Sequence, residues 1–289
     1  MPINVTYDKK VPSKRKRFLI LLLLVIWPIF AVTTTKAATI PAADPEYLQQ
    51  AYSQEETLWY EISWMGVKAG ELSIHLLPDQ KEPERFSILV TAKSAGLLAV
   101  FYPVEDNFET IVTGKARLPV LYSIDQHEGH RKNKKLTTYD QQQGIICKTR
   151  NKEKTETYKL AGPAYNEFSS FMIMRALPLV TGKELMVPTF ADNKRHEVMV
   201  RVEKKEKIRS IFGKTPTIRV RPQLPFKGLY KKTGDPTIWI SDDMARIPLK
   251  IKAKIVIGSL TAKLVAYQGW KKVPEPDPTI GNNDEESPQ

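Results

Sequence analysis

Arg175 is the residue that most clearly requires a polar partner, because it lies in the apolar stripe of a helix predicted over Pro163–Leu177. At 100° per residue, that stripe gathers Phe168, Phe171, Met172, Ala176 and Leu179. A guanidinium in such a face needs an acceptor, because a buried unpaired charge carries a large desolvation cost. Its expected partners are Asp242, Asp243, Asp106 and Glu109. Two roles fit: an ion pair that locks the helix onto the fold, or a clamp for a ligand anion in a cavity.

Two short polar strings have the residue types of catalytic or metal sites but not the spacing. Asp242 and Asp243 are adjacent, whereas glycoside cleavage needs carboxyl groups facing each other roughly 5 to 9 Å apart, and neighbouring turn acids usually cap backbone amides. The HEGH string at 127–130 lacks the spacing of the helical zinc motif and contains a turn-forming glycine. No histidine accompanies a serine or cysteine in a recognisable nucleophile motif. The sequence therefore favours a non-enzyme and predicts no catalytic residue, metal or cofactor.

A ligand-binding hypothesis rests on the space that a curved sheet would form around the predicted helix. An amphiphile would lay its acyl or isoprenoid part along the apolar lining, and its acidic head would reach the one guanidinium there. The predicted ligand-binding residues are Arg175, Phe171, Met172, Trp239 and Asp242. The competing outcome is a filled core in which Arg175 is permanently paired.

Strands are the elements expected to position these residues. From Ile247 to Ile257 the odd positions are apolar and the even ones include Lys250, Lys252 and Lys254, which is the period of a half-buried strand. That lysine stripe is either a solvated face that protects an edge or a contact for anionic lipid headgroups or polysaccharide. The predicted fold class is mainly β: a curved antiparallel sheet, as an open barrel or paired sheets, with one principal helix at about 163–177.

The N-terminal segment has the layout of a signal peptide. Basic residues precede an apolar run over 18–32, and Ala37 closes a small-residue cleavage site. We expect export to the periplasm with cleavage after Ala37; the alternative is an uncleaved segment that anchors the domain to the outer face of the inner membrane. Residues 1–37 hold seven Lys/Arg and one Asp, so cleavage lowers the net charge from +12 to +6. The remaining positive charge is spread along strands and loops, so no nucleic-acid partner is expected.

The predicted organisation has four parts: a signal peptide over 1–37, a lead-in over 38–54, a single β-rich domain over 55–270 and a disordered tail over 271–289. The tail is rich in Pro, Asn and acidic residues and has almost no apolar residue, which is typical of disorder. The single cysteine, Cys147, follows two isoleucines and is predicted to be a buried, inert thiol.

Three stretches carry a resemblance to a known family. They are YEISWMGVKAGELSIHL near the start, FSSFMIMRALPLVTGK in the middle and IWISDDMARIPLKIKAKIVIGSLTAKL near the end. In order and spacing they resemble the bacterial exported proteins grouped as domain-of-unknown-function family 3108, over about Glu55 to Trp270. The resemblance implies an exported, mainly antiparallel β domain. It implies no activity and transfers no catalytic residue.

Export, a curved sheet and the missing catalytic motifs together favour a function in the cell envelope. We expect a non-enzymatic protein that binds or carries an apolar or amphiphilic molecule, or that scaffolds an envelope protein partner. The expected partners are an amphiphilic lipid or an envelope polysaccharide, and the alternative is a hydrolase acting on envelope glycan or lipid. Converging titratable side chains in a cavity would favour the hydrolase, whereas apolar walls with a single charge would favour binding.

Overall fold

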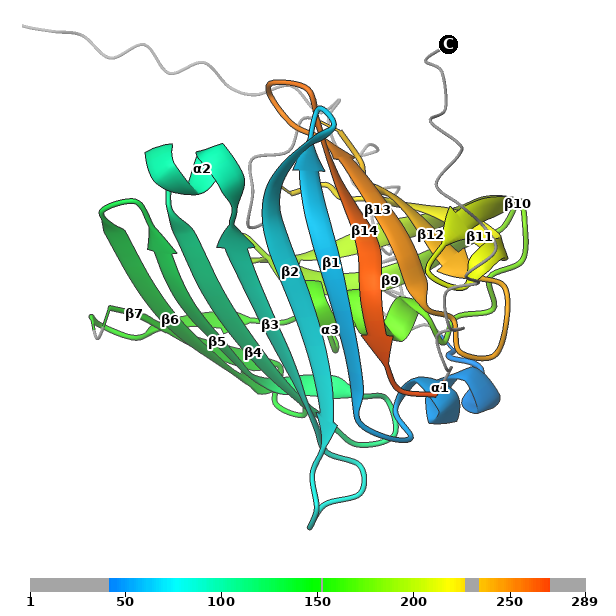
Figure 1. Ribbon diagram of the computed structural model, residues 1–289. Coiled ribbons are helices and arrows are strands. Elements are labelled where there is room, and N and C mark those ends of the chain that lie inside the picture. The colour runs from blue at the N-terminus through cyan, green and yellow to red at the C-terminus, as the bar shows by residue number, and fades with distance from the viewer. Residues whose placement is uncertain (1–41, 152, 227–233, 271–289) are drawn as a thin grey trace, which may run out of the picture. The chain divides into compact units, whose positions relative to one another are not determined.

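The computed structural model describes residues 42–151, 153–226 and 234–270. In this part of the chain, fourteen strands form one antiparallel sheet and three short helices accompany it (Figure 1). The strands are β1 (Glu56–Trp64), β2 (Val67–Pro78), β3 (Phe86–Ser94), β4 (Val104–Thr113), β5 (Leu118–Glu128), β6 (Arg131–Asp140), β7 (Ile145–Arg150), β8 (Glu156–Lys159), β9 (Glu184–Ala191), β10 (Lys194–Ser210), β11 (Gly213–Gln223), β12 (Thr237–Ser241), β13 (Pro248–Lys254) and β14 (Ser259–Gln268). The helices are α1 (Pro45–Ala51), α2 (Gly96–Phe101) and α3 (Glu167–Met174).

Consecutive strands are neighbours except β8 and β9, and β1 also pairs with β14. The order across the sheet is therefore β8 to β1 and then β14 to β9, which leaves β8 and β9 as its two edges. The sheet curves around α3, the helix that lies between these edges in the sequence (Figure 1). Because the edges do not pair with each other, the sheet is not closed into a barrel. The predicted fold class, mainly β with a curved antiparallel sheet, is confirmed, and of the two predicted alternatives the structure has the single open sheet and not paired sheets.

Within the described ranges, no helix combines the length and the apolar character needed to cross a membrane.

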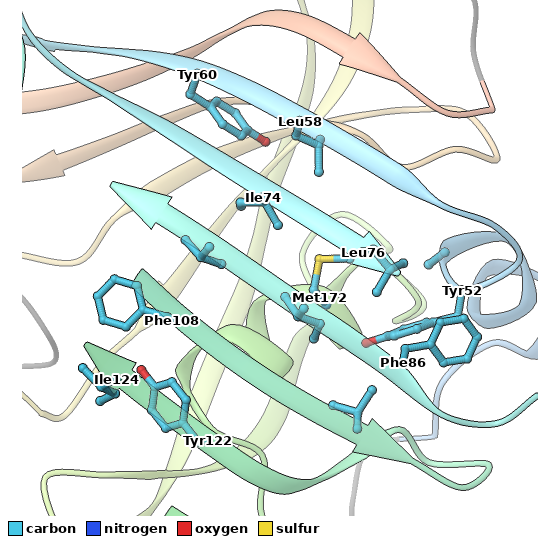
Figure 2. Close-up of a cluster of buried hydrophobic side chains, with 14 of the residues drawn as sticks. Tyr52, Leu58, Tyr60, Ile74, Leu76, Phe86, Phe108, Tyr122, Ile124 and Met172 are labelled. Atoms are coloured by element: carbon cyan, nitrogen blue, oxygen red, sulfur yellow. The ribbon is translucent and has the colours of Figure 1, made fainter. Parts of the chain in front are cut away.

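Alternation of residue type explains why these segments form strands with one buried face. In β3, Phe86, Ile88, Val90 and Ala92 are buried, and the residues between them keep part of their exposed surface. A period of two places all four on the inner face of the sheet. There Phe86, Ile88 and Val90 join side chains of neighbouring strands and Met172 of α3 in one apolar cluster (Figure 2). Each such side chain contributes about 1.5–3 kcal/mol when fully buried, so this cluster holds α3 against the sheet.

The helix α3 is shorter than the predicted segment 163–177. Asn166 caps it, because its Oδ1 accepts from the Ser169 N–H at 2.8 Å while Ser169 Oγ accepts from the Asn166 N–H at 2.9 Å. This capping box starts the helix at the next residue. Just before it, Tyr165 uses its own N–H and C=O to bond to the edge strand β9. The residues after Pro163 therefore extend an otherwise unpaired sheet edge instead of the helix.

The predicted lead-in at 38–54 contains the helix α1, which packs on the domain. Asp44 caps α1 with its side chain and donates its N–H to Ala176 O at 2.8 Å. Tyr52, just after the helix, is buried, and its ring packs edge-on against Phe86 with centroids 5.1 Å apart. The packed domain thus begins before residue 55. A seven-residue helix is too short for its apolar period to be recognised.

Two further predictions meet different outcomes. The predicted signal peptide 1–37 and the tail 271–289 lie outside the described residues. Cys147 is half-buried, so the expectation of a buried thiol is wrong. In β7 it points to the opposite face from the buried Ile146, and its Sγ lies 4.0 Å from Thr157 Oγ1. The alternation of the strand, not the apolar neighbours in the sequence, decides the exposure of the thiol.

Candidate functional site

Arg175 lies directly after α3 and keeps only 1% of its surface exposed. Its Nη1 and Nη2 donate to the two carboxylate oxygens of Glu56 at 2.5 and 2.9 Å. Its Nε donates to Arg246 O at 3.0 Å, and Nη2 also donates to Ala245 O at 2.9 Å. The Tyr267 hydroxyl donates to Glu56 Oε1 at 2.9 Å. This network ties the end of α3 to β1, to β14 and to the turn between β12 and β13.

The buried pair is electrostatically stable. Burial alone would lower the pKa of Arg175, but the charge and hydrogen bonds of Glu56 raise it above its ordinary value, so the guanidinium stays charged. The prediction that the acceptor is Asp242, Asp243, Asp106 or Glu109 is wrong. A ligand anion would have to displace a bidentate carboxylate that is itself held by a tyrosine. The geometry of Arg175 is therefore that of an internal lock.

Two of the other predicted ligand-binding residues lie near Arg175 in the interior. Met172 is fully buried in the apolar cluster of Figure 2, and its Sδ lies 4.0 Å from Arg175 Nη1. Phe171 keeps some exposed surface and packs against both apolar clusters of the domain. These side chains fill space between the helix and the sheet.

The remaining two predicted ligand-binding residues lie away from that interior. Trp239 in β12 donates its Nε1 to Glu206 Oε1 at 2.8 Å, and Lys250 Nζ lies 4.9 Å from the centre of its ring. Asp242 pairs with Lys205 at 2.7 Å. The structure thus brings together Arg175, Phe171 and Met172, but it places Trp239 and Asp242 in ion-pair and cation–π contacts elsewhere.

The polar strings have the turn geometry that the sequence indicates. Asp243 Oδ1 accepts from the N–H groups of Ala245 and Arg246 at 3.1 and 3.2 Å, as a turn cap does. The HEGH string forms the turn between β5 and β6, where His127 Nε2 lies 3.3 Å from Asp125 Oδ1. No group of three or more His, Cys, Asp or Glu side chains suited to a metal ion occurs in the described ranges.

A groove of about 660 Å³ opens where the tip of the β10–β11 hairpin faces β13 and β14. The pairing of β13 with β14 ends at Lys250 and Lys263, which lie directly opposite each other. Next to this point, Val265 is the extra residue that shifts the register of β14 against β1. Phe212 of the hairpin tip packs edge-on against Tyr267 with centroids 5.7 Å apart. The groove is therefore framed by a bulged, diverging strand pair and by a hairpin held against it.

The lining of this groove is amphipathic and carries charge of one sign. Its basic residues are Lys207, Arg209, Lys250 and Lys263, and none of its ten lining residues is acidic. Its aliphatic residues are Ile208, Ile211, Leu249, Leu264 and Val265. Like charges that lie directly opposite in a sheet destabilise it, so a bound anion would relieve the repulsion between Lys250 and Lys263. The arrangement suits a molecule with an acidic head and an apolar part.

A smaller pocket of about 130 Å³ lies on the inner face, between β5–β7 and the β9–β10 turn. Burial raises the pKa of Glu167, which begins α3, to about 7; nearby Asp192 adds to the rise, and Lys135 and Lys148 oppose it. Burial also lowers the pKa of Lys135, and Lys148 adds to this effect. Lys148 Nζ donates to Asn193 Oδ1 at 2.5 Å. The volume of this pocket is well below the about 300–1,000 Å³ of a typical organic-ligand site. We therefore expect its titratable groups to affect the stability of the fold and not to bind an organic ligand.

The comparisons with known proteins define the family and the fold. The chain matches the family model "Protein of unknown function (DUF3108)" over residues 60–265. No curated protein matches it. A solved structure, the beta-barrel-like protein of domain of unknown function DUF1849 from Brucella abortus, is similar with a TM-score of 0.53 and 10% identity, covering 80% of this chain and 100% of that one. The hypothetical protein CT021 from Chlamydia trachomatis gives a TM-score of 0.34 at 7% identity, covering 82% and 98%.

The family match extends from within β1 to within β14, so it includes the strands that form both the groove and the surroundings of Arg175. It confirms the resemblance carried by the three sequence stretches. The chain therefore belongs to the family of proteins of unknown function DUF3108.

Proposed function

We propose that this chain is an exported, non-enzymatic protein that binds anionic amphiphiles in the groove between the β10–β11 hairpin and β13–β14. The observation that carries the proposal is the lining of the groove, which combines four cations with five aliphatic side chains and includes no acid. The proposal keeps the predicted class of partner, an amphiphilic envelope lipid. It moves the site from the surroundings of Arg175 to the groove, because Arg175 is already paired with Glu56.

The cations of the groove support an acidic head. Lys207 and Lys263 are both exposed, and neither forms an ion pair with an acidic side chain of the described residues, although Glu61 lies opposite Lys263 in β1. Lysines that remain accessible can each form a charge-assisted hydrogen bond to a phosphate or carboxylate oxygen. Because Lys207 comes from the hairpin and Lys263 from β14, a bound anion would also link the two walls of the groove.

The aliphatic residues support an apolar tail. Leu249 and Leu264 are buried at the base of the groove, whereas Ile208 and Ile211 of the hairpin are half-buried. The volume of about 660 Å³ lies within the range of ordinary ligand sites. Burial of each methylene group of a ligand contributes about 0.8 kcal/mol, so tail length is expected to set much of the affinity.

Isothermal titration with single-chain lipids below their critical micelle concentration tests this function. Lysophosphatidylglycerol and lysophosphatidylcholine with the same acyl chain differ in net head charge, and we expect the anionic lipid to bind at least about tenfold more tightly, a difference of about 1.4 kcal/mol. Extending the acyl chain by two carbons should raise the affinity by up to about tenfold.

A charge-matched pair of variants identifies the site. Lys207→Gln with Lys263→Gln should reduce the affinity for the anionic lipid to that for the zwitterionic one. Lys159→Gln with Lys183→Gln removes the same net charge at exposed positions outside the groove and should leave the affinity unchanged. Equal binding of the two lipids, or equal loss in the two double variants, would contradict the proposal.

A further inference from the structure

A second surface of the molecule is conspicuously apolar and lies at one end of the sheet. The turns β1–β2 and β13–β14 and the helix α2 between β3 and β4 are all at this end, because the strands they join are antiparallel neighbours in the sheet (Figure 1). They carry seven large apolar side chains that are 66–82% exposed. This set, the apolar rim, consists of Met65, Val67, Leu97, Val100, Phe101, Val256 and Ile257.

Specific contacts hold these segments together. Trp64 Nε1 donates to Ile257 O at 2.8 Å, and the Met65 N–H donates to Ser259 O at 3.2 Å, which joins the β1–β2 turn to the β13–β14 turn. The Ala95 N–H donates to Ala69 O at 2.9 Å, which fixes the start of α2 against β2. The apolar rim is therefore a connected part of the fold, and its side chains are presented outward from anchored backbone.

Packing within the domain does not account for α2. All six of its residues, Gly96–Phe101, are apolar or glycine, and none of them is buried. Soluble proteins rarely expose a contiguous group of large apolar residues unless that surface meets a partner or a membrane. The helix thus has the composition of a buried element at a position where the domain offers it no cover.

The charges around the apolar rim are mainly basic. Arg131 and Lys132 begin β6 on one side of it, and Lys252 and Lys254 lie near the end of β13 on the other; all four are exposed. None of these four forms an ion pair with a residue of the described ranges.

Three acidic residues next to the apolar segments lie beside two lysines. Lys93 Nζ lies 2.9 Å from Glu105 beside α2, and Lys68 Nζ lies 2.8 Å from Glu71 and 3.5 Å from Glu61 beside the β1–β2 turn. These two lysines and the four exposed cations outnumber the nearby acids Glu61, Glu71, Glu105 and Glu128, so the surroundings of the apolar rim carry a net positive charge.

We propose that the apolar rim docks on the surface of a lipid bilayer with anionic headgroups. Its side chains protrude from two turns and a short helix at one end of the sheet, an arrangement that suits shallow insertion between headgroups better than burial in a single protein groove. The flanking cations then lie at the level of the phosphates, where each basic residue adds to the attraction. This inference rests on residues that are separate from the groove.

Co-sedimentation with lipid vesicles tests whether the apolar rim docks on a bilayer. The protein is expressed with its full N-terminal segment and is purified in the form that the cells produce. We expect binding to vesicles of phosphatidylglycerol and phosphatidylcholine in a 1:3 ratio, and at least about tenfold weaker binding to pure phosphatidylcholine. Leu97→Ser with Phe101→Ser should lower the binding by at least about tenfold, because both side chains lose their apolar contact with the bilayer. The matched control is Val180→Ser with Met186→Ser, two exposed apolar residues outside the apolar rim, and should bind as the unchanged protein does.

Insertion is read directly from a dye whose emission reports a change from water to lipid. The dye is attached to the introduced cysteine of Phe101→Cys, or of Val180→Cys as the control, in a Cys147→Ser background. A blue shift on anionic vesicles with the first variant alone is the expected result, and it is independent of membrane contacts made by other segments. Equal shifts at both positions, or no vesicle binding, would overturn the proposal. Self-association of the protein that is lost in Leu97→Ser with Phe101→Ser would also overturn it, because the apolar rim would then bind a second copy of the chain.

Discussion

Arg175 and the groove hold basic side chains under opposite conditions. Arg175 is buried and directs its guanidinium at the carboxylate of Glu56 and two backbone carbonyls. The groove holds four cations without an acid in its lining, and two of them, Lys250 and Lys263, lie directly opposite each other. The first arrangement is complete within the protein, whereas in the second Lys207 and Lys263 form no ion pair with a described residue.

This difference shows how to distinguish a structural charge from a binding charge. A cation in an apolar stripe must be paired for the chain to fold, because desolvation is costly. An accessible cation stays hydrated and does not need an internal partner for the chain to fold. The clustering of several such cations along an amphipathic groove therefore needs another explanation. The number of acceptors around a cation is therefore more informative about function than its burial.

The largest effect is expected from breaking the buried pair. Arg175→Met leaves Glu56 buried without its cation, and Glu56→Gln leaves the guanidinium without a counter-charge. Either change should lower the free energy of unfolding by about 3–5 kcal/mol, as measured by urea denaturation. The exposed pair Arg201–Glu184, 2.9 Å apart, provides the control: Glu184→Gln should cost less than about 1 kcal/mol.

The double variant Arg175→Met with Glu56→Leu sharpens this comparison. It removes both charges, so it should recover most of the stability lost in either single variant. If instead Arg175→Met leaves the stability intact and abolishes lipid binding, Arg175 is a ligand clamp after all.

A smaller and pH-dependent effect is expected at Glu167. Burial raises its pKa in the folded state to about 7, above the ordinary value of about 4.3 that applies to the unfolded chain. The folded state therefore holds the proton more tightly, and stability should fall as the pH rises from about 4.3 to about 7. Glu167→Gln should remove this dependence and be more stable than the unchanged protein at pH 8, by up to about 3.7 kcal/mol, while the two should have similar stability at pH 4. Urea denaturation across this range measures it, and identical pH profiles would contradict it.

The smallest effect is expected at Lys263. Lys263→Gln removes the repulsion from Lys250 across β13–β14 and the attraction to Glu61 across β1–β14, which offset each other, so stability should change by less than about 0.5 kcal/mol. Lys183→Gln, at an exposed position outside the groove, should leave the midpoint of thermal unfolding unchanged. A loss of stability of about 1 kcal/mol or more in Lys263→Gln would mean that this lysine is structural, as Arg175 is.

Much of the fold could be predicted because alternation is a local property of the sequence. The period of two in 247–257 predicts a strand, and β13 occupies Pro248–Lys254 of that stretch. The boundaries of α3 could not be predicted in this way. Its first turn is set by the capping box of Asn166, and the residues just before it pair with the edge of β9, which is distant in the sequence.

The candidate sites were less predictable because they depend on contacts between distant strands. The position of Arg175 in an apolar helical stripe correctly indicates a buried charge. Nothing local in the sequence, however, identifies Glu56, 119 residues away, as its partner. In the groove, Lys250 belongs to the predicted lysine stripe. Lys263 joins it through the pairing of β14 with β13, and Lys207 through the position of the β10–β11 hairpin. The predicted signal peptide at 1–37 lies outside the described residues, so export stays a prediction.

Native mass spectrometry of the protein purified from the cell envelope tests the central claim most directly. The account predicts an extra mass that solvent extraction identifies as an anionic amphiphile. This ligand should be absent from the variant Lys207→Gln with Lys263→Gln and present in the control Lys159→Gln with Lys183→Gln. A protein that carries no lipid, or a ligand that both double variants retain equally, would contradict the assignment of the groove as the binding site.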